Sequence, residues 1–104
     1  MAARPALTVP HIDAFIHEPA RLRLLVFLSV LKRADFVYLL RQSKMSRGNL
    51  SVQMAKLAEA GFVKIDKSFV NNRPRTMYEL TARGRSAFQE YKRAMASLLQ
   101  PLPE

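Results

Sequence analysis

The hydrophobic pattern of this chain changes its period at Gly61, and this change limits the folds that the chain can adopt. Before Gly61, apolar residues such as Leu50 and Met54 recur at helical intervals. After it, Val63 and Ile65 alternate with polar residues, which is typical of a strand with one face in water. Further along, helical spacing returns. The sequence therefore predicts a mainly α fold with a small β-hairpin (α+β).

Two helices are predicted in the N-terminal third. Ile12, Phe15 and Ile16 would form one stripe of a short helix that ends before Pro19. Since proline suits the first turn of a helix, a second helix is expected from Pro19 to about Arg33. Leucine and valine occur on both of its sides, which indicates a central, buried helix.

A helix-turn-helix pattern follows. Asp35 and Ser46 are each placed to cap the N-terminus of a helix, and the polar break Ser43-Lys44-Met45 separates the two helices. The second helix is amphipathic and would be closed by Gly61 as a C′ glycine. Two short helices joined by a three-residue break are typical of a helix-turn-helix motif.

The strands after Gly61 would be joined by the turn Asn71-Asn72-Arg73-Pro74-Arg75, because Asn tolerates left-handed geometry and Pro disfavours a central strand. Thr81 would cap a last helix that reaches about Leu99. Its apolar positions are spaced by four and three residues, as in a helix that packs along another helix; they are Gly84, Phe88, Tyr91, Met95 and Leu98.

This apolar seam has two interpretations. If the chain pairs with a second copy, the dimer interface consists of Phe88, Tyr91, Met95 and Leu98. Alternatively, the stripe only covers its own domain. The sequence leaves both open, and we expect the dimer.

The net charge of +9 is concentrated between residues 41 and 75. Eight lysines and arginines lie there against two acids, Glu59 and Asp66. A positive field of this kind attracts polyanions, nucleic acid first and anionic membranes second. The concentration favours a DNA-binding surface over a basic surface without a specific role.

The second helix of the pair carries side chains suited to a major groove. Arg pairs with guanine, Asn or Gln with adenine, and Val contacts the thymine methyl group, and Gly48 allows a close approach to phosphate. The candidate DNA contacts are Ser46, Arg47, Asn49, Ser51, Val52, Gln53 and Lys56 on the helix, and Asn72, Arg73 and Arg75 at the hairpin tip. The hairpin arginines would follow phosphates or enter a minor groove. An ordinary solvated helix face is the alternative.

Other chemistry finds little support in the sequence. There is no cysteine, and no catalytic triad, carboxylate pair or phosphate loop is recognisable, so we expect a non-enzyme without cofactor. A metal site at His11, Asp13, His17 and Glu18 is a weak alternative, because a metal sensor would be expected to use cysteine. The longest apolar run is too short for a membrane span, and the first ten residues lack a signal-peptide pattern, which predicts a cytoplasmic, nucleoid-associated protein.

Three runs of the sequence resemble winged helix-turn-helix regulators of the MarR/ArsR-like group: RLRLLVFL, SRGNLSVQMAKLAEAGFV and FVNNRPRTMYELTARGRSAF. The resemblance covers roughly residues 10–99. It implies a dimer with two recognition helices in successive major grooves, with the wings beside them. Relatives also bind small molecules between the DNA-binding and dimer helices, so the resemblance allows for a small-molecule effector. One departure is that Ser43-Lys44 stands where many relatives have a glycine, which leaves the register of the recognition helix open.

The chain is thus expected to contain a flexible tail (1–9), a winged helix-turn-helix DNA-binding domain (10–80), a dimerisation helix (81–99) and a second tail (100–104). The expected function is that of a sequence-specific transcriptional repressor that binds a pseudo-palindromic operator as a homodimer. One alternative is a winged-helix protein-interaction module without specific DNA binding. A peripheral membrane protein is the other, although no helix has the strongly cationic face it would need.

Overall fold

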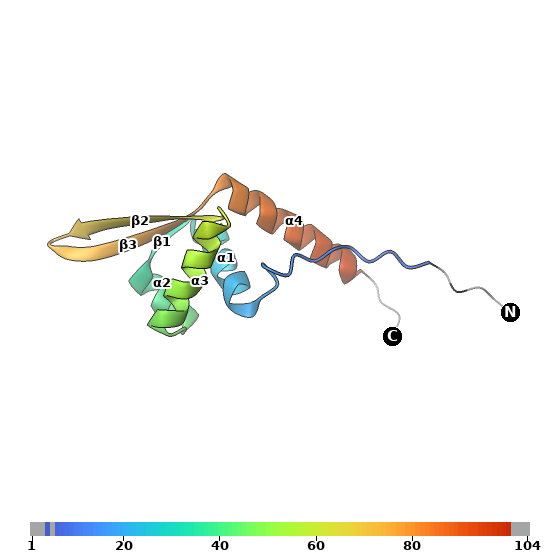
Figure 1. Ribbon diagram of the computed structural model, residues 1–104, viewed down its shortest axis with the longest axis horizontal. Helices are drawn as coiled ribbons and strands as arrows, with labels where there is room; N and C mark the ends of the chain where they lie inside the picture. The colour runs from blue at the N-terminus through green and yellow to red at the C-terminus, as the bar shows by residue number, and fades with distance from the viewer. Residues whose placement is uncertain (1–3, 5, 101–104) are drawn as a thin grey trace.

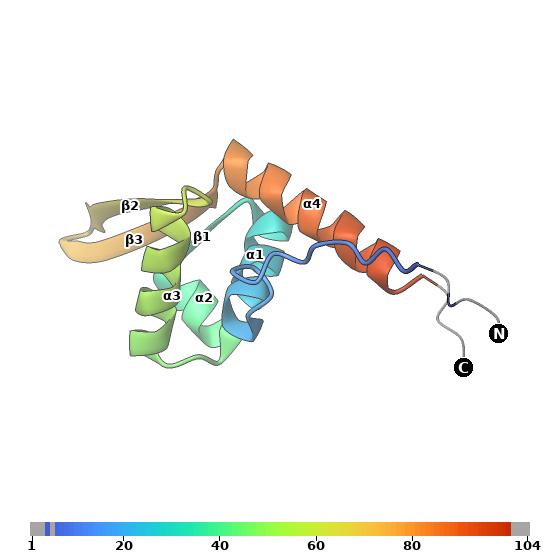
Figure 2. The ribbon, with the colours of Figure 1, turned by 45° about the vertical axis from the view of Figure 1, so that its right-hand side comes forward.

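The computed structural model describes residues 4 and 6–100, and it confirms a mainly α fold with a small antiparallel sheet. The parts of the expected tails at 1–3, 5 and 101–104 lie outside the described residues. Within the described part the elements are α1 (Pro19–Leu31), β1 (Arg33–Asp35), α2 (Phe36–Ser43), α3 (Arg47–Glu59), β2 (Val63–Val70), β3 (Arg73–Leu80) and α4 (Ala82–Leu98) (Figure 1). The strand order is β1-β3-β2, and α1, α2 and α3 lie on one side of the sheet (Figure 2).

The segment before α1 is a turn, so the prediction of a short helix at residues 12–16 is wrong. Asp13 Oδ1 accepts hydrogen bonds from the backbone N–H groups of Phe15 and Ile16 at 2.9 and 3.4 Å. Glu18 has extended backbone angles (φ −119°, ψ 129°) because a residue before proline disfavours the α conformation. The helical turn therefore cannot continue into α1, although Ile16 is fully buried.

The break between α2 and α3 is built without glycine. Lys44 adopts the left-handed conformation (φ 58°, ψ 23°), which a glycine would take with less strain. The buried Ser43 stabilises the turn: its hydroxyl accepts from the Met45 N–H, and its carbonyl accepts from Arg23 Nη2 at 3.1 Å. Ser46 then caps α3 as expected, because its hydroxyl accepts from the Asn49 N–H.

The hairpin turn is shorter than predicted and contains only Asn71 and Asn72, both with positive φ. This is the backbone that a two-residue hairpin requires. Pro74 belongs to β3, opposite Phe69, in the second pair from the turn. That pair makes no ladder hydrogen bonds in such a hairpin, so the missing N–H of proline costs nothing. The short strand β1 was not predicted; it pairs with the other end of β3.

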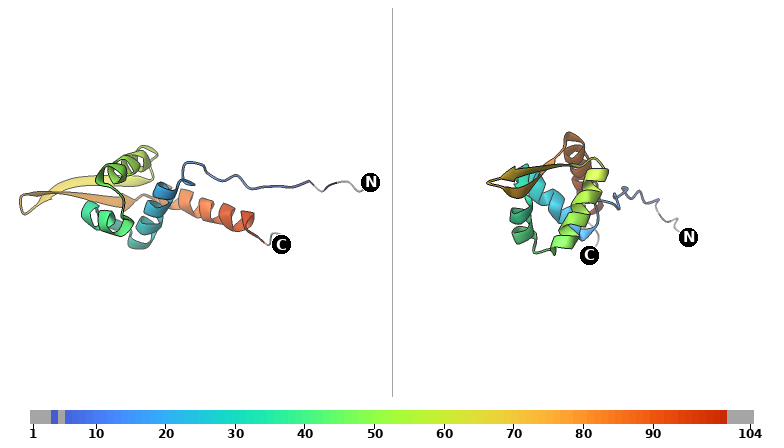
Figure 3. Two further views of the ribbon diagram at one scale, coloured as in Figure 1. Left: turned by 90° about the horizontal axis from the view of Figure 1, so that it is seen from below. Right: turned by 60° about the vertical axis from the view of Figure 1, so that its left-hand side comes forward.

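Thr81 caps helix α4, as predicted, and the first half of the helix packs into the domain. Gly84 is required there, because a Cβ atom at this position would overlap the carbonyl oxygen of Phe62. Phe88 and Tyr91 join the core that contains the central leucines of α1 and α3. The second half of α4 extends away from the domain, on the side opposite to the hairpin (Figures 1 and 3).

Candidate nucleic-acid interface

Helix α3 presents the predicted contact residues to solvent. Leu50, Met54 and Leu57 are buried on its inner side. Ser46, Arg47, Asn49, Ser51, Val52 and Lys56 are exposed, and Gln53 is half-buried. The N-terminal turn, where a recognition helix contacts base edges, is therefore open to a ligand.

The outermost strip of α3 consists of small residues that sequence reasoning partly missed. Gly48, Val52 and Ala55 follow one another at intervals of four and three and lie opposite the buried leucines. All three are exposed, and Val52 keeps 50% of its surface accessible. Such a strip lets the helix axis come close to another surface. Ala55 was overlooked because it carries no polar group; the small-residue spacing was the available signal.

Three arginines from α3 and from the β2–β3 hairpin, which we call the wing, meet at one hollow of about 310 Å³. Arg47 lies at the start of α3, with its guanidinium 5.7 Å from the centre of the Phe36 ring. Arg73 and Arg75 line the same hollow from β3. We call this surface the arginine hollow. Its three guanidinium groups are suited to binding the oxygens of phosphate.

The arginine hollow contains one acid. Asp35 Oδ2 lies 3.5 Å from Arg75 Nη2, and both side chains are partly exposed. Asp35 also caps α2 by accepting from the Tyr38 N–H at 2.7 Å. This pairing orients Arg75 and neutralises part of the positive charge, while Asn72 is exposed at the turn just beyond.

A second hollow of about 350 Å³ separates α3 from the wing. Ser51 and Ala55 line it from α3, and Lys67 and Thr76 line it from the sheet. Tyr78 also lines this hollow. Burial raises the pKa of its phenol, which therefore remains neutral at physiological pH. Ser51 is thus placed toward the wing rather than at the outermost strip.

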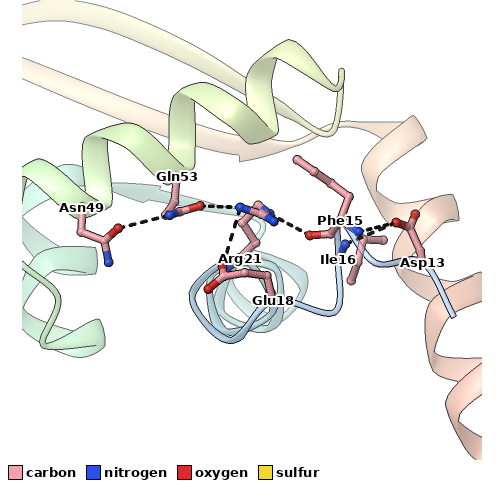
Figure 4. Close-up of polar contacts among 7 residues, drawn as sticks. All are labelled: Asp13, Phe15, Ile16, Glu18, Arg21, Asn49 and Gln53. Atoms are coloured by element: carbon pink, nitrogen blue, oxygen red, sulfur yellow. Dashed lines mark hydrogen bonds and ion pairs between the residues drawn. The ribbon is translucent and has the colours of Figure 1, made fainter.

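Gln53 and Asn49 belong to a chain of polar contacts that begins on α1 (Figure 4). Arg21 Nη1 donates to Gln53 Oε1 at 2.8 Å, and Gln53 Nε2 donates to Asn49 Oδ1 at 3.1 Å. Glu18 caps α1 next to Arg21, and the backbone N–H of Arg21 holds the pKa of Glu18 below its ordinary value. Sequence reasoning gave no role to Arg21, because its contact with Gln53 joins residues far apart in the chain.

The predicted seam of α4 divides into two parts. Phe88 and Tyr91 are buried in the chain's own core, and the Tyr91 hydroxyl lies 2.7 Å from His17 Nδ1. For this part the alternative interpretation, that the stripe covers its own domain, holds. Met95 and Leu98 are half-buried, and Leu99 has 63% of its surface exposed. Within this seam, the distal part is the one that leaves apolar surface accessible to a partner.

A further hollow of about 420 Å³ lies between the N-terminal segment and α4, with His11, Asp13, Glu90 and Tyr91 among its lining residues. Within residues 4 and 6–100, no group of three or more metal-ligating side chains is gathered there or elsewhere. No helix in this part of the chain is long and apolar enough to cross a membrane.

Comparisons with known proteins agree with this fold. A family model described as a winged helix DNA-binding domain matches residues 20–99. The uncharacterized protein MJ0432 of Methanocaldococcus jannaschii is 37% identical over 71 residues, which cover 68% of this chain and 77% of that protein. A transcriptional regulator homologue from Pyrococcus horikoshii shares the fold with a TM-score of 0.78 and 25% identity, over 84% of this chain and 86% of that one. NadR, solved in complex with 4-hydroxyphenylacetate, has a TM-score of 0.68 and 22% identity, over 81% and 62% of the two chains.

Proposed function

This chain belongs to the winged helix DNA-binding domain family, and from that premise we propose that it is a sequence-specific transcriptional regulator. In this proposal α3 enters a major groove and the β2–β3 wing lies along the neighbouring backbone. The observation that carries it is the arginine hollow beside the small, exposed strip of α3. Likeness to the regulator homologue from Pyrococcus horikoshii supports the same role.

The two parts of this surface have different tasks. Arg47, Arg73 and Arg75 neutralise phosphates, which gives affinity and a steep salt dependence, with a slope of about −0.9 per phosphate contacted. Val52 and the first turn of α3 face base edges, which gives sequence preference. Because phosphate contacts position the protein and base contacts specify the site, the two can be separated by mutation.

A homodimer and a repressor role complete the proposal. The distal part of α4, with the half-buried Met95 and Leu98 and the exposed Leu99, is the apolar surface for pairing with a second copy. Two-fold symmetry would place half-sites about one helical turn, roughly 34 Å, apart in a pseudo-palindromic operator. Such a dimer would repress by occupying a promoter. No catalytic activity is proposed.

A small-molecule effector is a further part of this proposal. NadR was solved with 4-hydroxyphenylacetate, and the present chain has a hollow between its N-terminal segment and α4. A ligand there would touch both the DNA-binding domain and the helix proposed for pairing. Thermal shift against a panel of small aromatic acids tests this point.

Selection of DNA fragments from the source genome tests the main proposal. The purified protein is incubated with fragments and excess competitor at about 150 mM salt, near physiological ionic strength. Recovery of a few sites that share an inverted repeat supports a specific regulator. Equal retention of all fragments that is lost as the salt concentration rises would indicate a protein that coats DNA without sequence preference. No retention would favour a protein-interaction module instead.

A further inference from the structure

The guanidinium of Arg21 is fixed on several sides next to the candidate reading helix. Only 12% of its side-chain surface is exposed. Its Nε donates to the Phe15 carbonyl at 2.7 Å, and its Cζ lies 4.4 Å from the centre of the Phe15 ring. Glu18 Oε2 lies 3.8 Å from Nη1, the same atom that donates to Gln53. Arg21 is therefore a preorganised donor directed at α3 (Figure 4).

This donor determines which way the neighbouring amides point. A guanidinium has no acceptor, so Gln53 must present its oxygen to Arg21. The Gln53 amide nitrogen then lies on the other side, 3.1 Å from Asn49 Oδ1. Asn49 accordingly turns its own oxygen toward Gln53 and its NH₂ group away from it. Asn49 is exposed in the first turn of α3.

We propose that Arg21, acting through Gln53, sets Asn49 as a hydrogen-bond donor toward the major groove. This inference rests on the proposed function. An outward NH₂ group matches base edges with acceptors, namely guanine N7 and O6, adenine N7 or thymine O4, and opposes the amino group of cytosine. Arg21 is then a positioning residue, and Gln53 is a relay instead of the base reader that the sequence suggested.

The substitution Gln53→Glu provides the sharpest test. A carboxylate still accepts from Arg21, but it cannot donate to Asn49 and can only accept from it. Asn49 must therefore rotate and present its oxygen outward. We expect the base preference at the position read by Asn49 to change from guanine or thymine, which only accept, to cytosine, which donates, by roughly three- to ten-fold, the range of one net hydrogen bond. Dissociation constants for the four base variants measure this change, and ratios within each protein cancel the effect of the added charge.

Two further variants control the interpretation. Arg21→Leu frees Gln53, so discrimination at that base pair should flatten while preferences elsewhere and the salt slope stay unchanged. Asn49→Ala should likewise reduce discrimination among the four bases at this base pair. Adding Arg21→Leu to Asn49→Ala should not reduce that discrimination further. Melting curves establish that each variant is folded. An unchanged preference in Gln53→Glu, or a uniform loss over all four bases in Asn49→Ala, would overturn the inference and leave Asn49 as a phosphate contact.

NMR of the free protein separates this inference from the proposed function. The Asn49 side-chain amide protons face solvent in the wild type and become hydrogen-bonded in Gln53→Glu, so their exchange should slow. If exchange does not change, the relay is wrong, even for a protein that selects operators. If exchange slows but the wild type selects no sequence, the proposed function has failed instead, and the donor role falls with it.

Discussion

Two of the three glycines differ sharply in what surrounds them. At Gly84 the backbone of α4 approaches the Phe62 carbonyl so closely that no Cβ atom fits. At Gly48, on the exposed side of α3, a Cβ atom would meet nothing within 4 Å. The sequence shows the same residue type at both positions. The contact that distinguishes them joins α4 to the loop before β2, and local patterns carry no information about it.

Alanine substitutions at these glycines should therefore have opposite effects on stability. Gly84→Ala should lower the free energy of unfolding by about 1–3 kcal/mol, because the backbone must move to relieve the overlap. Gly48→Ala should raise it by roughly 0.5–1 kcal/mol, since alanine is the better helix former. Urea unfolding of both variants measures the difference. Equal effects would mean that the close approach of α4 to Phe62 does not exist in solution.

The cap of α1 should respond to acid. The pKa of Glu18 is held below its ordinary value, first by the N–H of Arg21. The ionised carboxylate thus stabilises the folded chain above the pKa of the unfolded chain, and this contribution is lost as the pH falls through the lower folded pKa. Glu18→Gln should be less stable than the wild type at neutral pH by up to about 1 kcal/mol. The difference in the free energy of unfolding between the two proteins should become smaller as the pH falls. A difference that does not depend on pH would show that the charge of Glu18 plays no part.

At the scale of elements, features with local causes could be predicted. Asp35, Ser46 and Thr81 each cap the helix that follows, and in each case the side chain binds a backbone N–H three residues later. Strand β1 could not be predicted, because its three residues become a strand only by pairing with β3. The wing arginines were predicted as contacts, but their meeting with Arg47 depends on how the hairpin folds back over α2.

The wing is expected to act on DNA as a unit without sequence preference. Arg73→Ala should weaken binding to operator and random DNA by the same factor and lower the salt slope by about 1. Arg75→Ala should also weaken binding to both DNAs, because it removes a cation and leaves the Asp35 carboxylate without its partner. Arg93→Ala, an exposed position on α4, is the control for charge alone. A loss confined to the operator would instead give Arg73 a role in base recognition.

At the scale of the whole molecule, the hairpin and the distal half of α4 extend in opposite directions from one core (Figure 3). The heptad-like spacing of α4 is continuous in the sequence, yet Phe88 and Tyr91 are buried within the chain while Met95 and Leu98 are only half-buried. Spacing alone cannot reveal where the covering domain ends, because that depends on the position of the N-terminal turn and of α1. The structure thus divides one sequence pattern into a core segment and a candidate pairing segment.

This division gives the dimer a specific test. Leu98→Glu should shift the chain from dimer to monomer at micromolar concentration and leave the fold intact, because Leu98 lies beyond the residues packed against the core and the charge would be buried only between two copies. Tyr91→Glu should unfold the chain itself, since Tyr91 lies in the core. Ser97→Glu adds the same charge at an exposed position on another side of α4 and should leave the mass unchanged. Sedimentation velocity and circular dichroism separate these outcomes. If Leu98→Glu stays dimeric, the two copies meet on another surface, and the spacing of half-sites would follow that geometry.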